Sequence, residues 1–274
     1  MDFFINSVYA AIPINQYFLH PFWSSIGFIV KALVHIEIFQ YNIFAHKIVR
    51  LYREVIKAEM LKSIVFDLGG TLMEYAGMPL NWSDYYICGF EKVNEILKLN
   101  LSENDLQKSA NKLKSYNPRT SKREYEIKPE EIFNNIISNW EEKPAANKVI
   151  EIFFEGLGLK ANIYEYSTEL LKKCRNWGFK TACLTDLPNG MPDSLFKPGI
   201  EKILPYFDLY VSSQICGVRK PNKGGICYIA DAFEIRETEI LFVGDEEKDF
   251  LTALNAGCGF VYIDDFLEEI SFPR

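Results

Sequence analysis

Four polar residues stand at the ends of short apolar segments, where their side chains could act together. They are Asp67 after "SIVF", Thr185 after "ACL", Lys220 in the loop after Leu209–Ser212, and Asp245 after "LFVG". In open parallel sheets, ligands bind beyond the carboxyl ends of the strands. If these segments are neighbouring parallel strands, all four side chains meet at one edge of a sheet.

The residue types suit the transfer of a phosphoryl group. Asp67 can act as a nucleophile and also bind a metal. Asp245, with Asp249 in "GDEEKD", adds the hard oxygen ligands that Mg²⁺ prefers. Thr185 can donate a hydrogen bond to a phosphoryl oxygen, and the ammonium of Lys220 can bind the same oxygens and keep Asp67 ionised. Positioning and charge neutralisation dominate catalysis of such reactions.

The elements that must position these residues follow an alternating pattern of short apolar strands and helices. This pattern predicts an α/β fold with a parallel sheet wound on both faces, as in Rossmann-like domains. The predicted strands are Ser63–Phe66, Lys180–Thr185, Leu209–Ser212, Glu239–Asp245 and Gly259–Asp264.

Residues 83–157 lie between the first two predicted strands and read as helical throughout. Ser102 and Asp105 have the spacing of a capping box, and Pro129 and Pro144 stand where helices commonly begin. We therefore expect an inserted α-helical cap over the carboxyl edge of the sheet. The predicted domains are a helical extension at 1–59, a core formed by 60–78 and 160–274, and the cap at 79–159.

The order of these motifs resembles that of the haloacid dehalogenase-like hydrolase superfamily. The first motif of that family, a strand ending in D-x-D-G-T, reads "FDLGGTL" here, and the second, a strand ending in Ser or Thr, reads "CLTD". The third, a Lys commonly before Pro, reads "GVRKPN", and the fourth, G-D-x-x-x-D, reads "VGDEEKD". The resemblance covers the chain from about Met60 to its end and includes a helical cap inserted after the first motif.

The resemblance implies roles for individual residues. Asp67 is the expected nucleophile, which forms an aspartyl-phosphate. Mg²⁺ is expected to bind Asp67, the backbone carbonyl of Gly69 and Asp245, with Asp249 as a direct or water-mediated partner.

The transferring phosphoryl group is expected to bind Thr185 and Lys220. Gly70 and Asp186, at the same edge, are further candidates for phosphate contact. Gly69 and Gly70 also allow backbone groups to approach an anion or a metal closely.

The sequence departs from the family pattern at Gly69, where phosphatases of the family usually carry a second Asp that protonates the leaving oxygen. General acid–base help of this kind contributes typically about 10²–10⁴ in rate. Three outcomes follow: turnover of phosphates with good leaving groups, such as acyl or aryl phosphates; a substitute acid such as Glu74, Asp84 or Tyr85; or a site that binds a phosphorylated ligand without efficient turnover. Dehalogenation is less attractive, because that chemistry needs no metal.

Substrate choice in this superfamily depends largely on the cap. Trp82, Tyr85 and Tyr86 are candidates to line the entrance, although aromatic residues more commonly pack a cap against its core. No basic cluster in the cap indicates a highly charged substrate. Asp186 and the loop that follows it lie at the same predicted edge.

Composition narrows the classes of partner and compartment. The 274 residues carry a formal net charge of -7, which excludes the basic surface of a nucleic-acid-binding protein. The six cysteines form no C-x-x-C pair and have no neighbouring histidine. We therefore expect free thiols in a reducing compartment and a cytoplasmic protein.

The first 59 residues differ from the rest of the chain. Five basic and four acidic residues give them a charge of +1, they contain all three histidines, and no charged residue occurs between Phe3 and Val30. Pro13 and Pro21 interrupt this stretch, so a signal peptide is poorly supported. Three alternatives stay open for this segment. It is a helical appendage packed on the main domain, a peripheral membrane or partner-binding segment, or a dispensable segment before a natural start at Met60.

Two functions follow from these observations. The first is a Mg²⁺-dependent hydrolase of a small phosphorylated metabolite, which works through an aspartyl-phosphate and is weak because of Gly69. The second is a catalytically impaired homologue that binds a ligand or a protein partner.

Overall fold

A computed structural model of the chain describes residues 61–79 and 81–270. These residues belong almost wholly to the second of two units, Lys62–Arg274. The predicted extension at 1–59, with its expected membrane or partner contacts, lies outside the described residues. Within the described part of the chain, no helix is both long and apolar enough to cross a bilayer.

The central sheet of the described unit has five parallel strands in the order β5-β4-β1-β6-β7. The strands are β1 (Ser63–Phe66), β4 (Lys180–Thr185), β5 (Leu209–Ser212), β6 (Ile240–Gly244) and β7 (Gly259–Tyr262). β1 lies at the centre, where Phe66 pairs with Cys183 on one side and Val243 on the other. The parallel sheet expected from the sequence is confirmed, and Asp67 leaves it at the middle of its carboxyl edge.

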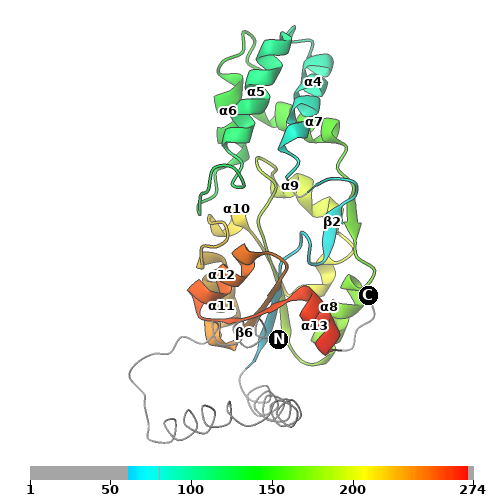
Figure 1. Cartoon of the computed structure of the whole chain (residues 1–274), viewed down its shortest axis with the longest axis vertical. Coiled ribbons are helices and arrows are strands. Elements are labelled where there is room, and N and C mark those ends of the chain that lie inside the picture. Colours follow the sequence, from blue (N-terminus) through cyan, green and yellow to red (C-terminus); the bar gives the residue numbers. More distant parts are fainter. Residues whose placement is uncertain (1–60, 80, 271–274) are drawn as a thin grey trace, which may run out of the picture. The chain divides into compact units, whose positions relative to one another are not determined.

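Helices cover both faces of this sheet (Figure 1). They are α8 (Ser167–Asn176) and α13 (Ile263–Glu269) on one face, and α11 (Gly224–Phe233) and α12 (Glu247–Ala256) on the other. Successive side chains of β1 point to opposite faces of the sheet. Phe66 packs edge-on against Phe266 of α13, with ring centroids 6.1 Å apart. Val65 joins a buried cluster with Ile226 and Ile229 of α11. Burial on both sides explains why β1 reads as a continuous apolar run.

Shorter elements complete the connections within the core. They are α9 (Asp193–Phe196), η2 (Lys197–Ile200), η3 (Leu204–Tyr206), α10 (Ser213–Cys216) and η4 (Glu237–Glu239). All six cysteines fall in the described part of the chain and are free thiols.

The cap helices pack around an aromatic core of their own. They are η1 (Ser83–Tyr85), α4 (Tyr86–Leu97), α5 (Glu103–Ser115), α6 (Pro129–Ile137) and α7 (Ala146–Leu157). Phe153 is fully buried between Phe90 and Phe133, with ring centroids 4.8 and 5.3 Å away. The predicted capping box is confirmed, because the Ser102 hydroxyl accepts from the Asp105 N–H and the Asp105 carboxylate accepts from the Ser102 N–H.

The prediction of continuous helix across the cap is wrong for residues 116–128, which form turns and extended backbone between α5 and α6. Pro118 disfavours helical backbone at the residue before it. The Asn117 side chain accepts a hydrogen bond of 3.0 Å from the N–H of Arg119, a local turn that competes with helix. This break leaves a loop on the side of the cap that faces the core.

A pair of short strands, which the sequence did not reveal, joins the cap to the core. β2 (Met73–Tyr75) pairs antiparallel with β3 (Ala161–Ile163), so the chain enters and leaves the cap along adjacent strands. The hydroxyl of Ser167 anchors this link by donating to the Leu72 carbonyl at 2.7 Å. The connection from the core into the cap therefore begins as a defined strand.

Candidate active site

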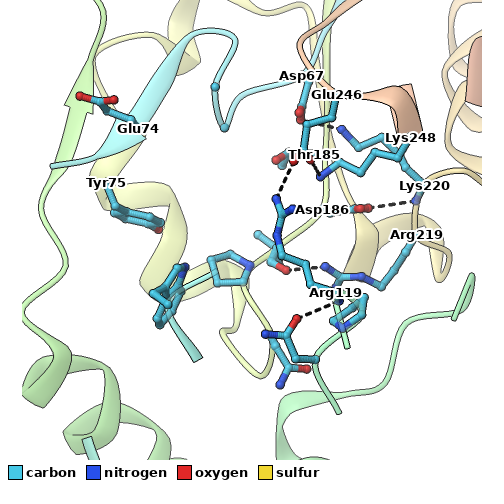
Figure 2. Close-up of a pocket in the computed structure, with 18 of the residues that line it drawn as sticks. Asp67, Glu74, Tyr75, Arg119, Thr185, Asp186, Arg219, Lys220, Glu246 and Lys248 are labelled. Atoms are coloured by element: carbon cyan, nitrogen blue, oxygen red, sulfur yellow. Dashed lines mark hydrogen bonds and ion pairs between the residues drawn. The ribbon is translucent and has the colours of Figure 1, made fainter. Parts of the chain in front are cut away.

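Asp67 and Lys220 form a buried ion pair at the carboxyl edge of the sheet (Figure 2). The N–H of Asp67 donates to the Val243 carbonyl at 2.9 Å, which fixes the backbone just beyond β1. The Nζ of Lys220 lies 2.8 Å from Oδ1 of Asp67, and the two side chains are only 2% and 4% exposed. The sequence placed both residues at strand ends, and the structure brings them into direct contact.

Asp249 holds both Lys220 and the loop between β6 and α12. Its Oδ1 lies 2.5 Å from Nζ of Lys220. Its Oδ2 accepts from the N–H groups of Asp245 and Glu246, at 3.2 and 3.0 Å. Because both carboxylate oxygens have donors, the geometry favours a positioning or water-mediated role for Asp249 over direct metal binding.

Asp245 approaches the loop after β1 so closely that only glycine fits there. Oδ1 of Asp245 accepts from the Thr71 hydroxyl at 3.0 Å. Gly70 has a φ of +82°, and a Cβ at this position would lie 2.0 Å from Oδ2 of Asp245. The N–H of Gly70 donates to the Met73 carbonyl at 2.8 Å. Gly70, a predicted phosphate contact, therefore serves to bring the Asp245 carboxylate close.

The three predicted carboxylates form a compact cluster suited to a metal. One oxygen each from Asp67, Asp245 and Asp249 lies within 4.8 Å of the others. Hard carboxylate oxygens suit Mg²⁺, which Asp67 and Asp245 could bind directly and Asp249 through a water molecule. Gly70 leaves the space that the Asp245 carboxylate occupies, which also indicates a binding site at this position. The residues present therefore fit Mg²⁺.

Burial and neighbouring charges shift the pKa values of Asp67, Asp245 and Lys220. Burial raises the pKa of Asp67 to about 7, although Lys220 opposes the shift. Burial and the neighbouring Asp249 raise the pKa of Asp245 to about 6. Burial alone would lower the pKa of Lys220, but Asp249 and Asp67 raise it above its ordinary value. Lys220 is therefore charged. A further cation beside Asp67 and Asp245 would favour their ionised forms.

Thr185 ends β4 and Asp186 follows it, at the same edge of the sheet. Thr185 is 3% exposed and lines one cavity together with Asp67 and Lys220. Oδ1 of Asp186 accepts from the backbone N–H of Lys220 at 3.1 Å. Asp186 thus orients the loop that carries the lysine, whereas a direct contact between its carboxylate and a phosphate would bring like charges together.

A cavity of about 960 Å³ opens between this edge and the cap. Its lining includes three cap residues with basic side chains: Arg119, Lys122 and Arg123. The expectation that the cap lacks a basic cluster is therefore wrong. The three lie in the loop between α5 and α6, and Arg119 reaches across to the core, where Nη2 lies 2.8 Å from Oε1 of Glu246. Although burial opposes it, Lys248 and Arg119 lower the pKa of Glu246 to about 2.

Comparison with known proteins now identifies the family. Residues 61–257 match the family model described as haloacid dehalogenase-like hydrolase. The chain belongs to this family. The expectation drawn from the four motifs is confirmed.

The haloacid dehalogenase-like relatives include enzymes with named activities. The chain is 32% identical over 115 residues to a phosphoglycolate phosphatase of Vibrio vulnificus (strain CMCP6), a match covering 41% of this chain and 49% of that protein. A phosphoglycolate phosphatase of Nitrosospira multiformis is 32% identical over 89 residues, 32% of this chain and 38% of that protein. The chain thus spans half or less of the length of these curated relatives.

A solved structure agrees in fold. The 2-haloacid dehalogenase of Pseudomonas syringae pv. Tomato DC3000 superposes with a TM-score of 0.52 at 16% identity, covering 74% of this chain and 86% of that one. At this identity the likeness shows the shared haloacid dehalogenase-like fold alone.

None of the three residues expected to replace the family's second Asp lies well for that task. Asp84 pairs with Lys114 at 2.7 Å with its side chain 82% exposed, and neither Asp84 nor Tyr85 is among the described residues that line the cavity. Glu74 lines the cavity, but Figure 2 shows its carboxylate on the opposite wall, directed away from Asp67. It accepts hydrogen bonds of 3.3 Å from Asn162 and Tyr164.

Two of the three aromatic residues considered for the entrance do line the cavity. Trp82 packs edge-on between Tyr75 and Tyr86, with ring centroids 6.4 and 5.8 Å away, and all three border the cavity. Tyr85 instead is 44% exposed. The cavity therefore has an aromatic wall that faces the basic loop of the cap.

Proposed function

We propose that the chain is a Mg²⁺-dependent phosphohydrolase that acts on small phosphorylated metabolites through an aspartyl-phosphate on Asp67. The observation that carries the proposal is the convergence of three carboxylates within 4.8 Å, with the ammonium of Lys220 2.8 Å from Asp67. This arrangement supplies a nucleophile, hard metal ligands and a cation for phosphoryl oxygens in one buried place. The names of the phosphoglycolate phosphatases to which the chain is similar point the same way.

Asp67 is the proposed nucleophile. One of its carboxylate oxygens forms a bond to phosphorus while the bond from phosphorus to the leaving oxygen breaks, and the electron pair departs with that oxygen. Water then attacks the phosphorus of the aspartyl-phosphate, which releases inorganic phosphate and restores Asp67. Lys220 and Thr185 bind the phosphoryl oxygens, and Asp249 and Asp186 hold Lys220 in place.

Asp67 and Asp245, with the backbone carbonyl of Gly69, would hold Mg²⁺. The ion would neutralise charge on the carboxylates and the phosphoryl oxygens. Asp249 would act through Lys220 and through the loop that carries Asp245.

Among the described residues, the proposed hydrolase has no carboxylate at the position of the family's proton donor. Gly69 offers no side chain, and a Cβ there would meet no atom within 4 Å. Without general acid catalysis, worth about 10²–10⁴ in rate, hydrolysis should favour esters whose leaving oxygen is stable as an anion. Aryl and acyl phosphates meet this condition, and simple alkyl phosphates do not.

The open space at Gly69 also favours a second candidate, a catalytically impaired member of the family that binds a phosphorylated ligand or a protein partner. The ligand-binding form of this candidate would use Lys220 and Thr185 and omit turnover. One experiment separates the two functions.

That experiment measures phosphate release from p-nitrophenyl phosphate and from an alkyl phosphate, with Mg²⁺ and with EDTA. We expect Mg²⁺-dependent turnover of the aryl ester, its loss in Asp67→Asn, and a gain on the alkyl ester in Gly69→Asp. Turnover that survives Asp67→Asn would refute the nucleophile. No turnover of either ester, in wild type or Gly69→Asp, would favour the binding function.

A further inference from the structure

The loop between α5 and α6 of the cap pairs directly with the core loop that carries Lys220. Residues 124–126 run antiparallel to residues 217–219, with Tyr125 opposite Val218. Two backbone hydrogen bonds, of 2.9 and 3.0 Å, flank this pair. The cap is therefore attached to the core at a second place, separate from the β2–β3 link.

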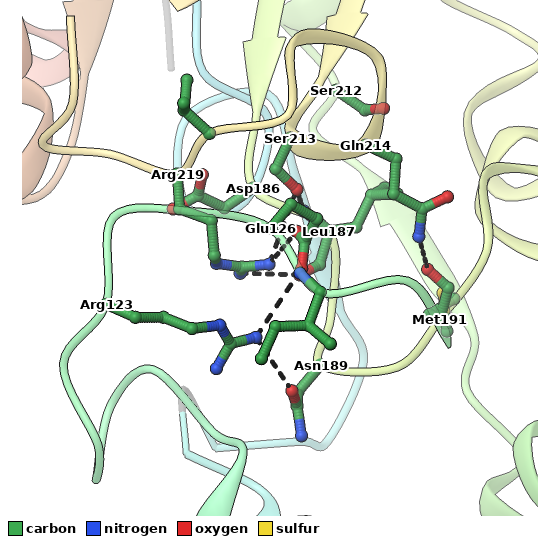
Figure 3. A network of polar contacts seen from close by, with 12 residues as sticks. Arg123, Glu126, Asp186, Leu187, Asn189, Met191, Ser212, Ser213, Gln214 and Arg219 are labelled. Atoms are coloured by element: carbon green, nitrogen blue, oxygen red, sulfur yellow. Dashed lines mark hydrogen bonds and ion pairs between the residues drawn. The ribbon is translucent and has the colours of Figure 1, made fainter. Parts of the chain in front are cut away.

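A buried cluster of charges reinforces this attachment (Figure 3). The carboxylate of Glu126 contacts the guanidinium of Arg219, and each side chain is only 6% exposed. The guanidinium of Arg123 lies 3.6 Å from the same carboxylate. Nη2 of Arg219 also donates to the Leu187 carbonyl at 2.8 Å. The pair thus joins the cap loop to the loops after β4 and β5.

Further bonds from the same cluster reach deeper into the cap. Nη2 of Arg123 donates to Oδ1 of Asn189 at 3.3 Å, and Nδ2 of Asn189 donates to the Leu113 carbonyl at 3.0 Å. Leu113 belongs to α5, so the loop after β4 contacts both a cap helix and the cap loop. Displacement of the cap loop would disturb two core loops, the one that follows Thr185 and the one that carries Lys220.

The step from Arg219 to Lys220 is a single peptide unit. The N–H of Arg219 bonds to the cap, and the N–H of Lys220 bonds to Asp186 at 3.1 Å. The Nζ of Lys220 then reaches Asp67 and Asp249. Because one peptide unit joins the two residues, we expect a shift at Arg219 to displace the backbone of Lys220 and, with it, the ammonium.

We propose that Glu126 is a positioning residue for Lys220, which acts through Arg219 and makes the engaged position of the lysine depend on the docked cap loop. The inference rests on the proposed function in one respect, because it takes Lys220 as the cation for the phosphoryl group. The rival interpretation is that the pair only stabilises the junction between cap and core.

Charge removal separates the two interpretations. Glu126→Gln leaves Arg123 and Arg219 buried near each other without their shared carboxylate, which costs stability under either interpretation. Glu126→Leu combined with Arg123→Met and Arg219→Met removes all three buried charges, and apolar replacement of a buried ion pair or triad is often neutral or stabilising. Only the positioning interpretation predicts that this triple variant recovers its melting temperature but not its kcat.

The test uses the full chain in Mg²⁺, with kcat and KM for p-nitrophenyl phosphate, the melting temperature, and hydrogen–deuterium exchange of peptides that contain residues 217–220. Glu130→Gln, at an exposed position of α6, is the matched control. We expect Glu126→Gln to lower kcat roughly 10²-fold, as for other small displacements of a reacting group, and to speed exchange at the amides of Arg219 and Lys220. The control should match wild type in both readouts.

Recovery of kcat together with melting temperature in the triple variant would overturn the proposal, as would wild-type exchange at residues 217–220 in Glu126→Gln. Exchange does not require turnover. If the wild-type chain hydrolyses no phosphate ester, the proposed function fails, while the exchange data still decide whether Glu126 holds the Lys220 loop.

Discussion

The ammonium of Lys220 lies 2.8 Å from Oδ1 of Asp67, with both side chains almost fully buried. With Asp249 at 2.5 Å on the other side, the lysine is a cation between two acids. A buried pair of this kind is weak evidence for stability by itself, because each charge has lost its water. The pair instead supports the proposal that Lys220 binds phosphoryl oxygens.

Lys220→Met should therefore damage stability and activity together. Removal of one partner from a buried ion pair costs about 3–5 kcal/mol, and loss of one donor to a developing anion costs about 10²–10³ in kcat. Urea unfolding and aryl phosphate turnover measure the two effects. Mg²⁺ should restore part of the stability, since it also neutralises the carboxylates. Lys223→Met, three residues away and exposed, is the control and should behave as wild type.

The metal-free protein should lose stability as the pH rises. Burial raises the pKa of Asp67 to about 7 and that of Asp245 to about 6, so between pH 4 and 7 the folded state binds more protons than the unfolded state. Stability then falls with increasing pH across this window. Melting in EDTA at pH 5 and pH 7.5 should show the fall, and Mg²⁺ should remove it by binding the ionised carboxylates.

Asp67→Asn isolates the contribution of this group from other titrating residues. In EDTA the variant should show a smaller decrease in melting temperature between pH 5 and pH 7.5 than wild type. An equal decrease in both proteins would mean that the cluster is not the origin of the effect.

Two adjacent glycines should respond differently to one methyl group. Gly70→Ala forces a side chain into left-handed backbone at φ +82° and against Asp245, so we expect a loss of about 1–3 kcal/mol and weaker Mg²⁺ binding. Gly69→Ala meets open space and should change the unfolding free energy by less than about 0.5 kcal/mol. Urea unfolding and calorimetric titration with Mg²⁺ test both; equal effects would contradict the assignment of Gly70.

The edge of the sheet was predictable from the sequence because it depends on local patterns and one topological rule. Each of the strands that precede Asp67, Thr185 and Asp245 is a short apolar run with a polar residue at its end, and parallel strands place such residues together. The separate contributions of Asp249 and Gly70 were not predictable, since they depend on how two loops approach each other. Three-residue strands such as β2 are too short to show a period.

The cap was harder to predict for a related reason. Arg119, Lys122 and Arg123 fall within five residues of the sequence. On a continuous helix they would share one face, but the sequence does not show where that face would point. The turn at Pro118 instead leaves them in a loop, and only the fold shows that this loop borders the cavity. The three cations are the strongest signal in the cap that sequence reasoning missed.

Arg119 forms an ion pair with a core carboxylate, Glu246, and its replacement should affect substrate binding more than folding. Its ion pair with Glu246 joins side chains that are 39% and 20% exposed, so Arg119→Ala should change the unfolding free energy by no more than about 1 kcal/mol. At the cavity the guanidinium can attract an anionic substrate, and loss of about 1.4 kcal/mol of binding raises KM roughly tenfold. Arg119→Lys should recover part of this loss, because it keeps the charge, whereas Lys108→Ala on α5 should leave KM unchanged. A KM for p-nitrophenyl phosphate that is the same in Arg119→Ala and wild type would show that the substrate does not contact this part of the cap.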